Sequence, residues 1–121
     1  MTEVGMKLRD KSFAFALRIV KLAQYLESDK KDFVLSRQLL RSGTSIGANI
    51  RESRFAQSTA DFVAKLHIAL KEAEETGYWL ELLLAADFIT AKQAASLTKD
   101  LGWLAGTLVN TVKKCKAKQD K

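Results

Sequence analysis

Three arginines, Arg37, Arg41 and Arg51, fall on one face of a predicted helix, where their guanidinium groups could contact the phosphates of RNA or DNA. A second set of cations lies near the C-terminal end and comprises Lys113, Lys114, Lys116 and Lys118. We predict that these seven side chains bind nucleic acid. Two other interpretations stay open, because the arginines could pair with carboxylates of this or a neighbouring chain, and the lysines could form a solvated tail.

The overall charge suits polyanionic partners. The 121 residues include 20 Lys and Arg against 14 Asp and Glu, so the net charge is +6, which attracts polyanions without proving that one is bound. Most of the excess lies in residues 33–60 and 113–121, whereas residues 61–87 are net acidic. The acidic segment offers the arginines four candidate ion-pair partners: Asp61, Glu72, Glu74 and Glu75.

Catalytic chemistry has little support in the residue pattern. The one histidine, His67, has no Glu three residues before it, as the Glu-x-x-His pattern of di-iron bundles requires. The pairs Glu72 with Glu75 and Glu74 with Glu81 could hold a cation, but exposed carboxylates on a helix are ordinarily solvated. A glycine-rich phosphate loop is absent from the sequence. We therefore predict a protein that is not an enzyme and uses no metal or cofactor.

The composition predicts one globular domain spanning residues 1–121, since 47% of the residues are hydrophobic and 28% are charged. Proline is absent, which permits long uninterrupted helices. The single cysteine, Cys115, excludes an internal disulfide and suits a reducing compartment, so we expect a cytoplasmic protein. Neither a signal peptide nor a membrane span is predicted.

The elements that must position these groups are four helices. Hydrophobic periodicity predicts them at about residues 12–27, 33–56, 60–86 and 90–116, with the Lys-rich tail at 113–121. Ser12 is the predicted N-cap of the first helix. Short connections and the lack of strand-like alternation predict an all-α fold, an antiparallel up-and-down four-helix bundle.

The first and third predicted helices carry more apolar surface than a bundle core needs. The first helix has one apolar stripe of Phe13, Leu17 and Val20 and a second apolar stripe on the opposite side. The third helix has one apolar row that suits the core and further apolar side chains on another face. One stripe should face the bundle and the other needs a cover, which we assign to a second copy of the chain. The predicted oligomer interface is Phe15, Ile19, Leu22, Leu26, Ile68, Trp79 and Leu82. The alternative is a monomer whose wide core absorbs both stripes.

The second predicted helix contains a segment of low helix propensity, residues 41–52, with two Gly, two Ser and one Thr. Gly43 and Gly47 are four residues apart, so they could admit a neighbouring backbone and support tight helix packing. Asn49 lies at the edge of the same face and would need partners if buried, which makes it a candidate for fixing the register between helices.

Several stretches of the sequence resemble the bacterial four-helix-bundle proteins of the 23S rRNA intervening-sequence family. They are residues 12–17 (SFAFAL), 38–50 (QLLRSGTSIGANI), 58–62, 68–73 and 78–80. The residues that match the family's second-helix motif are Arg41, Ser42, Ser45, Asn49 and Glu52, and those that match its third-helix motif are Glu72, Glu75 and Trp79. The family is named after insertions in the large-subunit rRNA gene, which does not make its members ribosomal proteins.

The resemblance implies an up-and-down bundle that assembles as a ring-like homopentamer. It also implies kinship with the accessory variability protein of diversity-generating retroelements, a basic pentamer that acts with nucleic acid and a reverse transcriptase. Members often carry basic residues where Gly77 and Glu81 stand, so this third helix is unusually acidic. The arginine stripe and the Lys-rich tail are therefore the predicted nucleic-acid surface. The alternative function is a protein scaffold that docks a partner through Glu72, Glu74 and Glu75 or through the face of Trp103.

Overall fold

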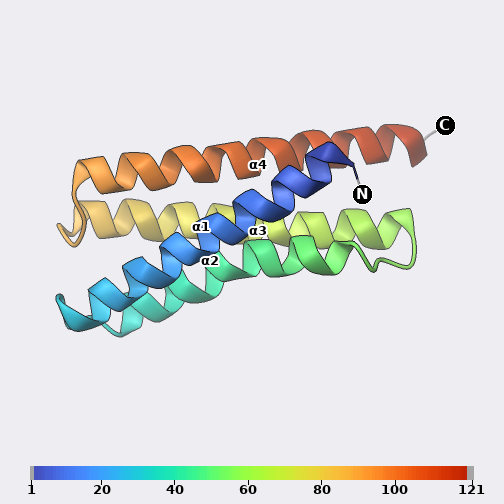
Figure 1. Cartoon of the computed structure of the whole chain (residues 1–121). Helices are drawn as coiled ribbons and strands as arrows, with labels where there is room; N and C mark the ends of the chain where they lie inside the picture. The colour runs from blue at the N-terminus through green and yellow to red at the C-terminus, as the bar shows by residue number, and fades with distance from the viewer. Residues whose placement is uncertain (1, 120–121) are drawn as a thin grey trace.

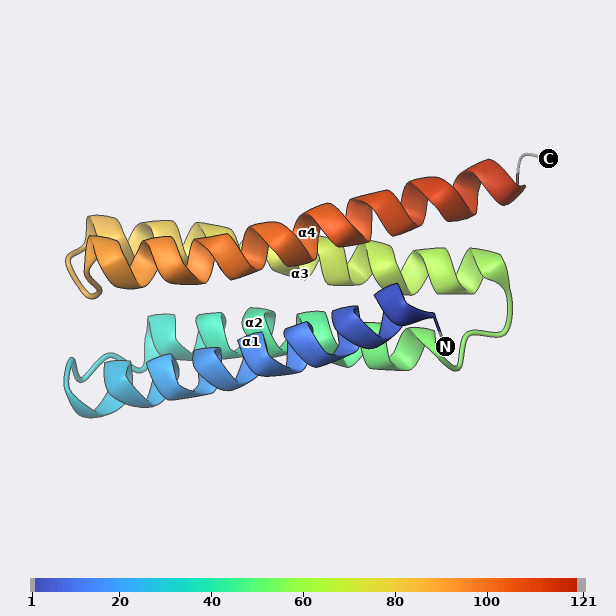
Figure 2. The ribbon, with the colours of Figure 1, turned by 45° about the horizontal axis from the view of Figure 1, so that its top comes forward.

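The computed structural model describes residues 2–119 and contains four long helices (Figure 1). They are α1 (Glu3–Ser28), α2 (Val34–Ser53), α3 (Thr59–Ala85) and α4 (Ala91–Gln119), and the described residues contain no strand. Successive helices run antiparallel and pack side by side, α1 on α2, α2 on α3 and α3 on α4, whereas α1 meets α4 more sparsely. Figure 2 shows two layers, with the α3–α4 pair above the α1–α2 pair. The predicted all-α up-and-down bundle is confirmed.

The first helix begins about nine residues earlier than predicted. Its N-cap is Thr2, whose Oγ1 accepts a hydrogen bond from the Gly5 amide at 3.0 Å. Ser12 lies in the middle of α1, is only 1% exposed, and donates its hydroxyl to the Arg9 carbonyl at 3.0 Å. The prediction that Ser12 caps the helix is therefore wrong, because an earlier residue already supplies the cap and the intervening turns continue the helix.

The other helix starts follow local capping signals. Ser58 accepts a hydrogen bond from the Asp61 amide at 3.0 Å at the start of α3. Thr90 and Gln93 form a reciprocal capping box before α4, with bonds of 3.1 and 2.8 Å. The start of α2 has no side-chain cap at Phe33, but Asp32 Oδ2 accepts from an amide of its first turn at 3.0 Å. These signals are local, so sequence reasoning located these starts within one residue.

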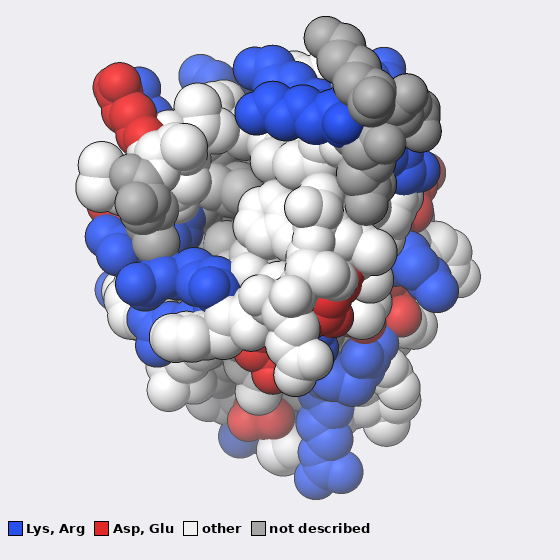
Figure 3. All heavy atoms as spheres, turned by 90° about the vertical axis from the view of Figure 1, so that its right-hand side faces the viewer, with Lys and Arg blue, Asp and Glu red and all other residues white. Residues whose placement is uncertain are grey.

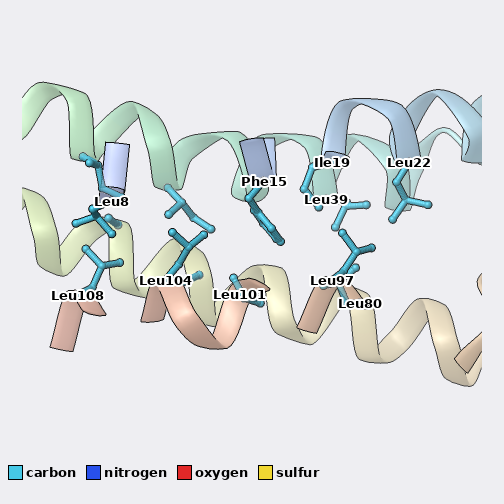
Figure 4. Close-up of a cluster of buried hydrophobic side chains, with 14 of the residues drawn as sticks. Leu8, Phe15, Ile19, Leu22, Leu39, Leu80, Leu97, Leu101, Leu104 and Leu108 are labelled. Carbon is cyan, nitrogen blue, oxygen red and sulfur yellow. The ribbon is translucent and has the colours of Figure 1, made fainter. Parts of the chain in front are cut away.

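The core lies between the two helix pairs and is made of leucine, isoleucine, valine, alanine and one phenylalanine (Figure 4). On α4 the residues that face this core are Leu97, Leu101, Leu104, Leu108 and Val112, all of them buried. On α3 the core-facing residues are buried from Leu66 to Leu83 and include Val63, whereas Phe62 is half-buried.

The interface predicted on α1 is wrong. Its members Phe15, Ile19, Leu22 and Leu26 are at most 9% exposed and form part of the chain's own core (Figure 4). The opposite stripe faces outward, with Phe13 63% and Leu17 49% exposed. Periodicity separates two stripes on a helix, but the position of the neighbouring helices decides which of them is buried.

Two glycines of α2 set how closely α1 approaches. A Cβ atom added at Gly43 would lie 2.8 Å from Cγ2 of Ile19, and one added at Gly47 would lie 3.5 Å from the backbone oxygen of Ser12. Side-chain-free positions therefore let the two helices come close, which confirms the predicted tight packing.

We expect Gly43→Ala to destabilise the protein. Overpacking costs about 1–3 kcal/mol, and the contacted atoms belong to the stiff β-branched Ile19, which cannot easily yield. The gain in helix propensity, at most about 1 kcal/mol, offsets only part of this cost. Gly106→Ala is the matched control, because nothing lies within 4 Å of its added Cβ, and it should raise the free energy of unfolding. Urea denaturation of both variants measures the effect, and equal stabilisation by both would contradict the close approach.

Candidate nucleic-acid interface

The fold brings together most of the cations predicted to bind nucleic acid. The start of α1, the end of α2 and the end of α4 meet at one end of the bundle (Figures 1 and 2). Arg51 therefore lies at the same end as Lys113, Lys114, Lys116 and Lys118. Arg37, in contrast, lies near the start of α2, roughly 21 Å away from Arg51 along the helix axis at 1.5 Å per residue.

Three further cations at this end were missed by sequence reasoning. Lys7 and Arg9 belong to the first turns of α1, which the sequence analysis did not assign to a helix, and Arg54 follows α2 directly. The signal that could have placed the first two is the heptad spacing of the buried Leu8 and Phe15, which extends the helix backwards. We call the following set the basic end: Lys7, Arg9, Arg51, Arg54, Lys113, Lys114, Lys116 and Lys118.

Most of the basic end is free to meet an anion. Within residues 2–119, only Lys7 and Arg9 of this set form ion pairs, both with carboxylates on their own helix at 3.7 and 3.1 Å. The other six side chains are exposed and have no ion-pair partner among the described residues. Figure 3 looks onto this end and shows lysine and arginine atoms on several of its sides, with fewer acidic ones. Such a concentration of unpaired cations favours a polyanionic ligand.

Arg41 has a different partner. Its Nη2 donates to Glu75 Oε2 at 2.5 Å and its Nη1 to Glu72 Oε1 at 3.4 Å, so α2 and α3 are joined by charge. The hydrogen bond to Glu75 is the main cause that raises the pKa of Arg41, and the charges of both carboxylates add to it. The ion pairing that the sequence left as an alternative is confirmed for Arg41, and this guanidinium is therefore not free for phosphate.

Glu75 also accepts a hydrogen bond from Trp79 Nε1 at 3.1 Å. This bond, together with the bond and charge of Arg41, lowers the pKa of Glu75 below its ordinary value of 4.5, although partial burial opposes the shift. Glu72 is more enclosed, with 18% of its side chain exposed, and its Oε2 has a charge contact with Arg41 but no hydrogen-bond donor among the described residues. The family-motif residues Arg41, Glu72, Glu75 and Trp79 thus form one cluster between two helices.

The register between α2 and α3 is marked by hydroxyl groups. Thr76 Oγ1 donates to Ser42 Oγ at 3.0 Å, and both residues are fully buried. Asn49 was predicted for this role, but it is only half-buried and its Nδ2 donates to the Ser45 carbonyl of its own helix at 2.8 Å. That prediction is wrong, because the side chain lies along α2 and makes its bond within the helix. Glu52 is a surface residue with a 4.0 Å contact to Lys65.

Apolar side chains remain exposed on two helices that do not touch. Ile68 and Leu82, two of the predicted interface residues on α3, are 43% and 36% exposed, and Trp79 is half-buried. On α1 the exposed pair is Phe13 and Leu17. Because α1 and α3 are diagonal in the bundle, these are two separate surfaces.

Acidification should destabilise the protein through Glu75. Its pKa is lower in the folded chain than in the unfolded chain, so its stabilising contribution is complete above about pH 4.5 and is lost as the pH falls through the folded value. Urea midpoints measured from pH 7 to pH 3 should therefore fall less steeply below pH 4.5 in Glu75→Gln than in the unmodified protein. Glu74→Gln, a change at an exposed residue of the same helix, is the control and should keep the original slope. An unchanged slope in Glu75→Gln would contradict the cluster.

The described residues show no sign of two other kinds of site. They contain no group of three or more His, Cys, Asp or Glu side chains placed to hold a metal ion. Nor do they include a helix both long and apolar enough to cross a membrane.

Comparisons with known proteins agree on one family. Residues 5–110 match the model of a family described as 23S rRNA-intervening sequence protein. The fold is also that of a crystal structure from Bacteroides thetaiotaomicron VPI-5482, described as a protein with unknown function from the S23 ribosomal protein family. The two chains are 52% identical, the match covers 91% of this chain and 98% of that one, and the TM-score is 0.90. Among curated proteins there is no match.

Proposed function

This chain belongs to the family of 23S rRNA-intervening sequence proteins, and we propose that it is a self-assembling, non-enzymatic bundle that binds RNA or DNA through its basic end. One observation carries the proposal, namely that lysines and arginines from distant parts of the chain converge at one end of the molecule, six of them without an ion-pair partner among residues 2–119. Their mutual repulsion is relieved when a polyanion is bound, and the release of counterions from the nucleic acid adds to the affinity. Such binding reads the phosphate backbone and not the sequence of bases.

Self-association is supported by the two exposed apolar surfaces. One surface is formed by Phe13 and Leu17 on α1, and the other by Ile68 and Leu82 on α3. The two surfaces are unlike each other and lie on helices that are diagonal in the bundle. When the α1 surface of one copy binds the α3 surface of the next, the copies form a closed ring if the rotation between neighbours divides a full turn evenly. The family resemblance predicts five copies in such a ring. A ring would display several basic ends to one polymer, so that weak contacts add up.

The experiment that tests this function combines light scattering with size exclusion. The protein is run alone and with a random RNA or DNA duplex, each at low and at high salt. We expect a particle of about five subunits that shifts with nucleic acid at low salt and not at high salt. A monomer would contradict the assembly. An oligomer whose size does not change when RNA or DNA is added would contradict nucleic-acid binding.

A protein scaffold is the second candidate function. It is favoured by Trp103, which is 38% exposed on α4 beneath the Lys11 ammonium, 4.9 Å from the ring centre. The acidic surface predicted as the other docking site is weaker, because Glu72 and Glu75 are already engaged by Arg41. Retention of a specific protein after nuclease treatment, lost in Trp103→Ala, would favour this function over the first.

A further inference from the structure

The turn between α2 and α3 presents an unusually exposed aromatic ring. Phe55 is 77% exposed, more than any other large hydrophobic side chain of the described residues. Its backbone is held in place, since its amide donates to the Glu52 carbonyl at 3.0 Å and the next amide to the Ser53 carbonyl at 3.2 Å. The backbone therefore presents the ring at a defined place on the surface, although burying the ring would be favourable by the hydrophobic effect.

One arginine lies near this ring in space, and a second is close to it in the sequence. The guanidinium carbon of Arg54 lies 5.7 Å from the ring centre, and Arg51 lies one helical turn earlier in α2. Both cations belong to the basic end and lack ion-pair partners among the described residues. The nearby Glu52 is contacted by Lys65 at 4.0 Å, which offsets its charge.

A groove between α1 and α2 reaches Arg51 near the end of α2. It has a volume of about 350 Å³, and its lining includes the small residues Gly47 and Ala48, the cations Arg9 and Arg51, and one carboxylate, Glu52. Cations near an exposed aromatic ring are also how proteins hold single strands, whose phosphates follow the charges while the bases stack on the rings.

We infer that the basic end selects single-stranded nucleic acid, with Phe55 as the stacking platform for an unpaired base and Arg51 and Arg54 as contacts for the flanking phosphates. This inference rests on the proposed function and names its substrate class. Bases in a duplex already stack on each other and cannot cover the ring, so a duplex engages only the charges. An unpaired base gains the apolar contact as well, and the source of the strand, RNA or DNA, does not alter this chemistry.

The test compares strands that differ only in pairing. Binding of a labelled 12-nucleotide RNA without self-complementarity, its DNA equivalent and the corresponding duplexes is measured by fluorescence anisotropy. Phe55→Ala removes the ring on which a base stacks, so it should weaken single-strand binding about tenfold and change duplex binding less than twofold. The slope of affinity against salt should stay unchanged, since no phosphate contact is removed. Phe55→Trp should retain the single-strand affinity.

The matched control is Phe33→Ala, which removes another exposed ring, 50% exposed, at the opposite end of the bundle. It should leave both affinities unchanged. Equal losses for single strand and duplex in Phe55→Ala, or no loss at all, would overturn the inference while leaving the proposed function in place. A change in oligomer size on light scattering would also overturn it, because the ring would then be covered by a second copy. If the unmodified protein binds neither strand nor duplex, the proposed function itself fails.

Discussion

Replacing Phe15 with alanine is expected to lower the free energy of unfolding by about 3–5 kcal/mol. The ring is 1% exposed and points from α1 toward the α3–α4 pair in the middle of the core (Figure 4). Truncation leaves a cavity in addition to the lost burial, because a close-packed core that includes the fully buried Leu39 and Leu104 relaxes only partially around it. Urea denaturation followed by circular dichroism measures the loss. Stabilities of domains of this size are about 5–15 kcal/mol, so a large part of the total would disappear.

Phe13→Ala is the matched control, because it makes the same change two residues away on the outward stripe, where the ring is 63% exposed. Its unfolding free energy should change little, while the oligomer seen by light scattering should dissociate at a higher protein concentration than that of the unmodified chain. The opposite pattern would be a Phe15→Ala variant that is stable but no longer assembles and a Phe13→Ala variant that is unstable. That result would mean that the stripe containing Phe15 is the interface, as the sequence predicted.

The second large effect is expected from reversing charges at the basic end. The combined variant Arg51→Glu, Lys113→Glu and Lys114→Glu should lose affinity for a duplex by roughly 100-fold, on the basis of about 1 kcal/mol for each charge near a polyanion. Fewer counterions are released by this variant, so the slope of log affinity against log salt should become less steep by about 3. Fluorescence anisotropy at three salt concentrations gives both quantities.

The control reverses the same number of charges at the opposite end, in Lys30→Glu, Lys31→Glu and Lys92→Glu. This variant has the same net charge, so it separates a local surface from a general effect of charge. It should lose affinity only slightly and keep the original salt slope. Equal losses in both variants would show that total charge, and not the basic end, governs binding.

The helices themselves follow from the sequence. Four hydrophobic periods with caps such as Ser58 and Thr90 located three of the four starts within one residue, because capping and amphipathicity are local properties. The close packing at Gly43 and Gly47 could also be anticipated, since small residues four apart mark a face that a backbone can approach. Residues 12–17 and 38–50 supported the family assignment that the match over residues 5–110 confirms. The pentamer, the kinship with the retroelement accessory protein and the cytoplasmic location stay predictions.

Only the tertiary structure decided how the faces and charges are used. Periodicity gives the angle between two side chains of one helix but not the direction of its neighbours, so it could not tell that Phe15 is buried and Phe13 exposed. Arg41 and Arg51 look alike along α2, yet one lies opposite Glu75 of α3 and the other does not. The basic end itself gathers residues from the two ends of the chain and from its middle. Electrostatic interactions depend on distance in space, and the antiparallel packing of the helices, not the order of residues, determines that distance.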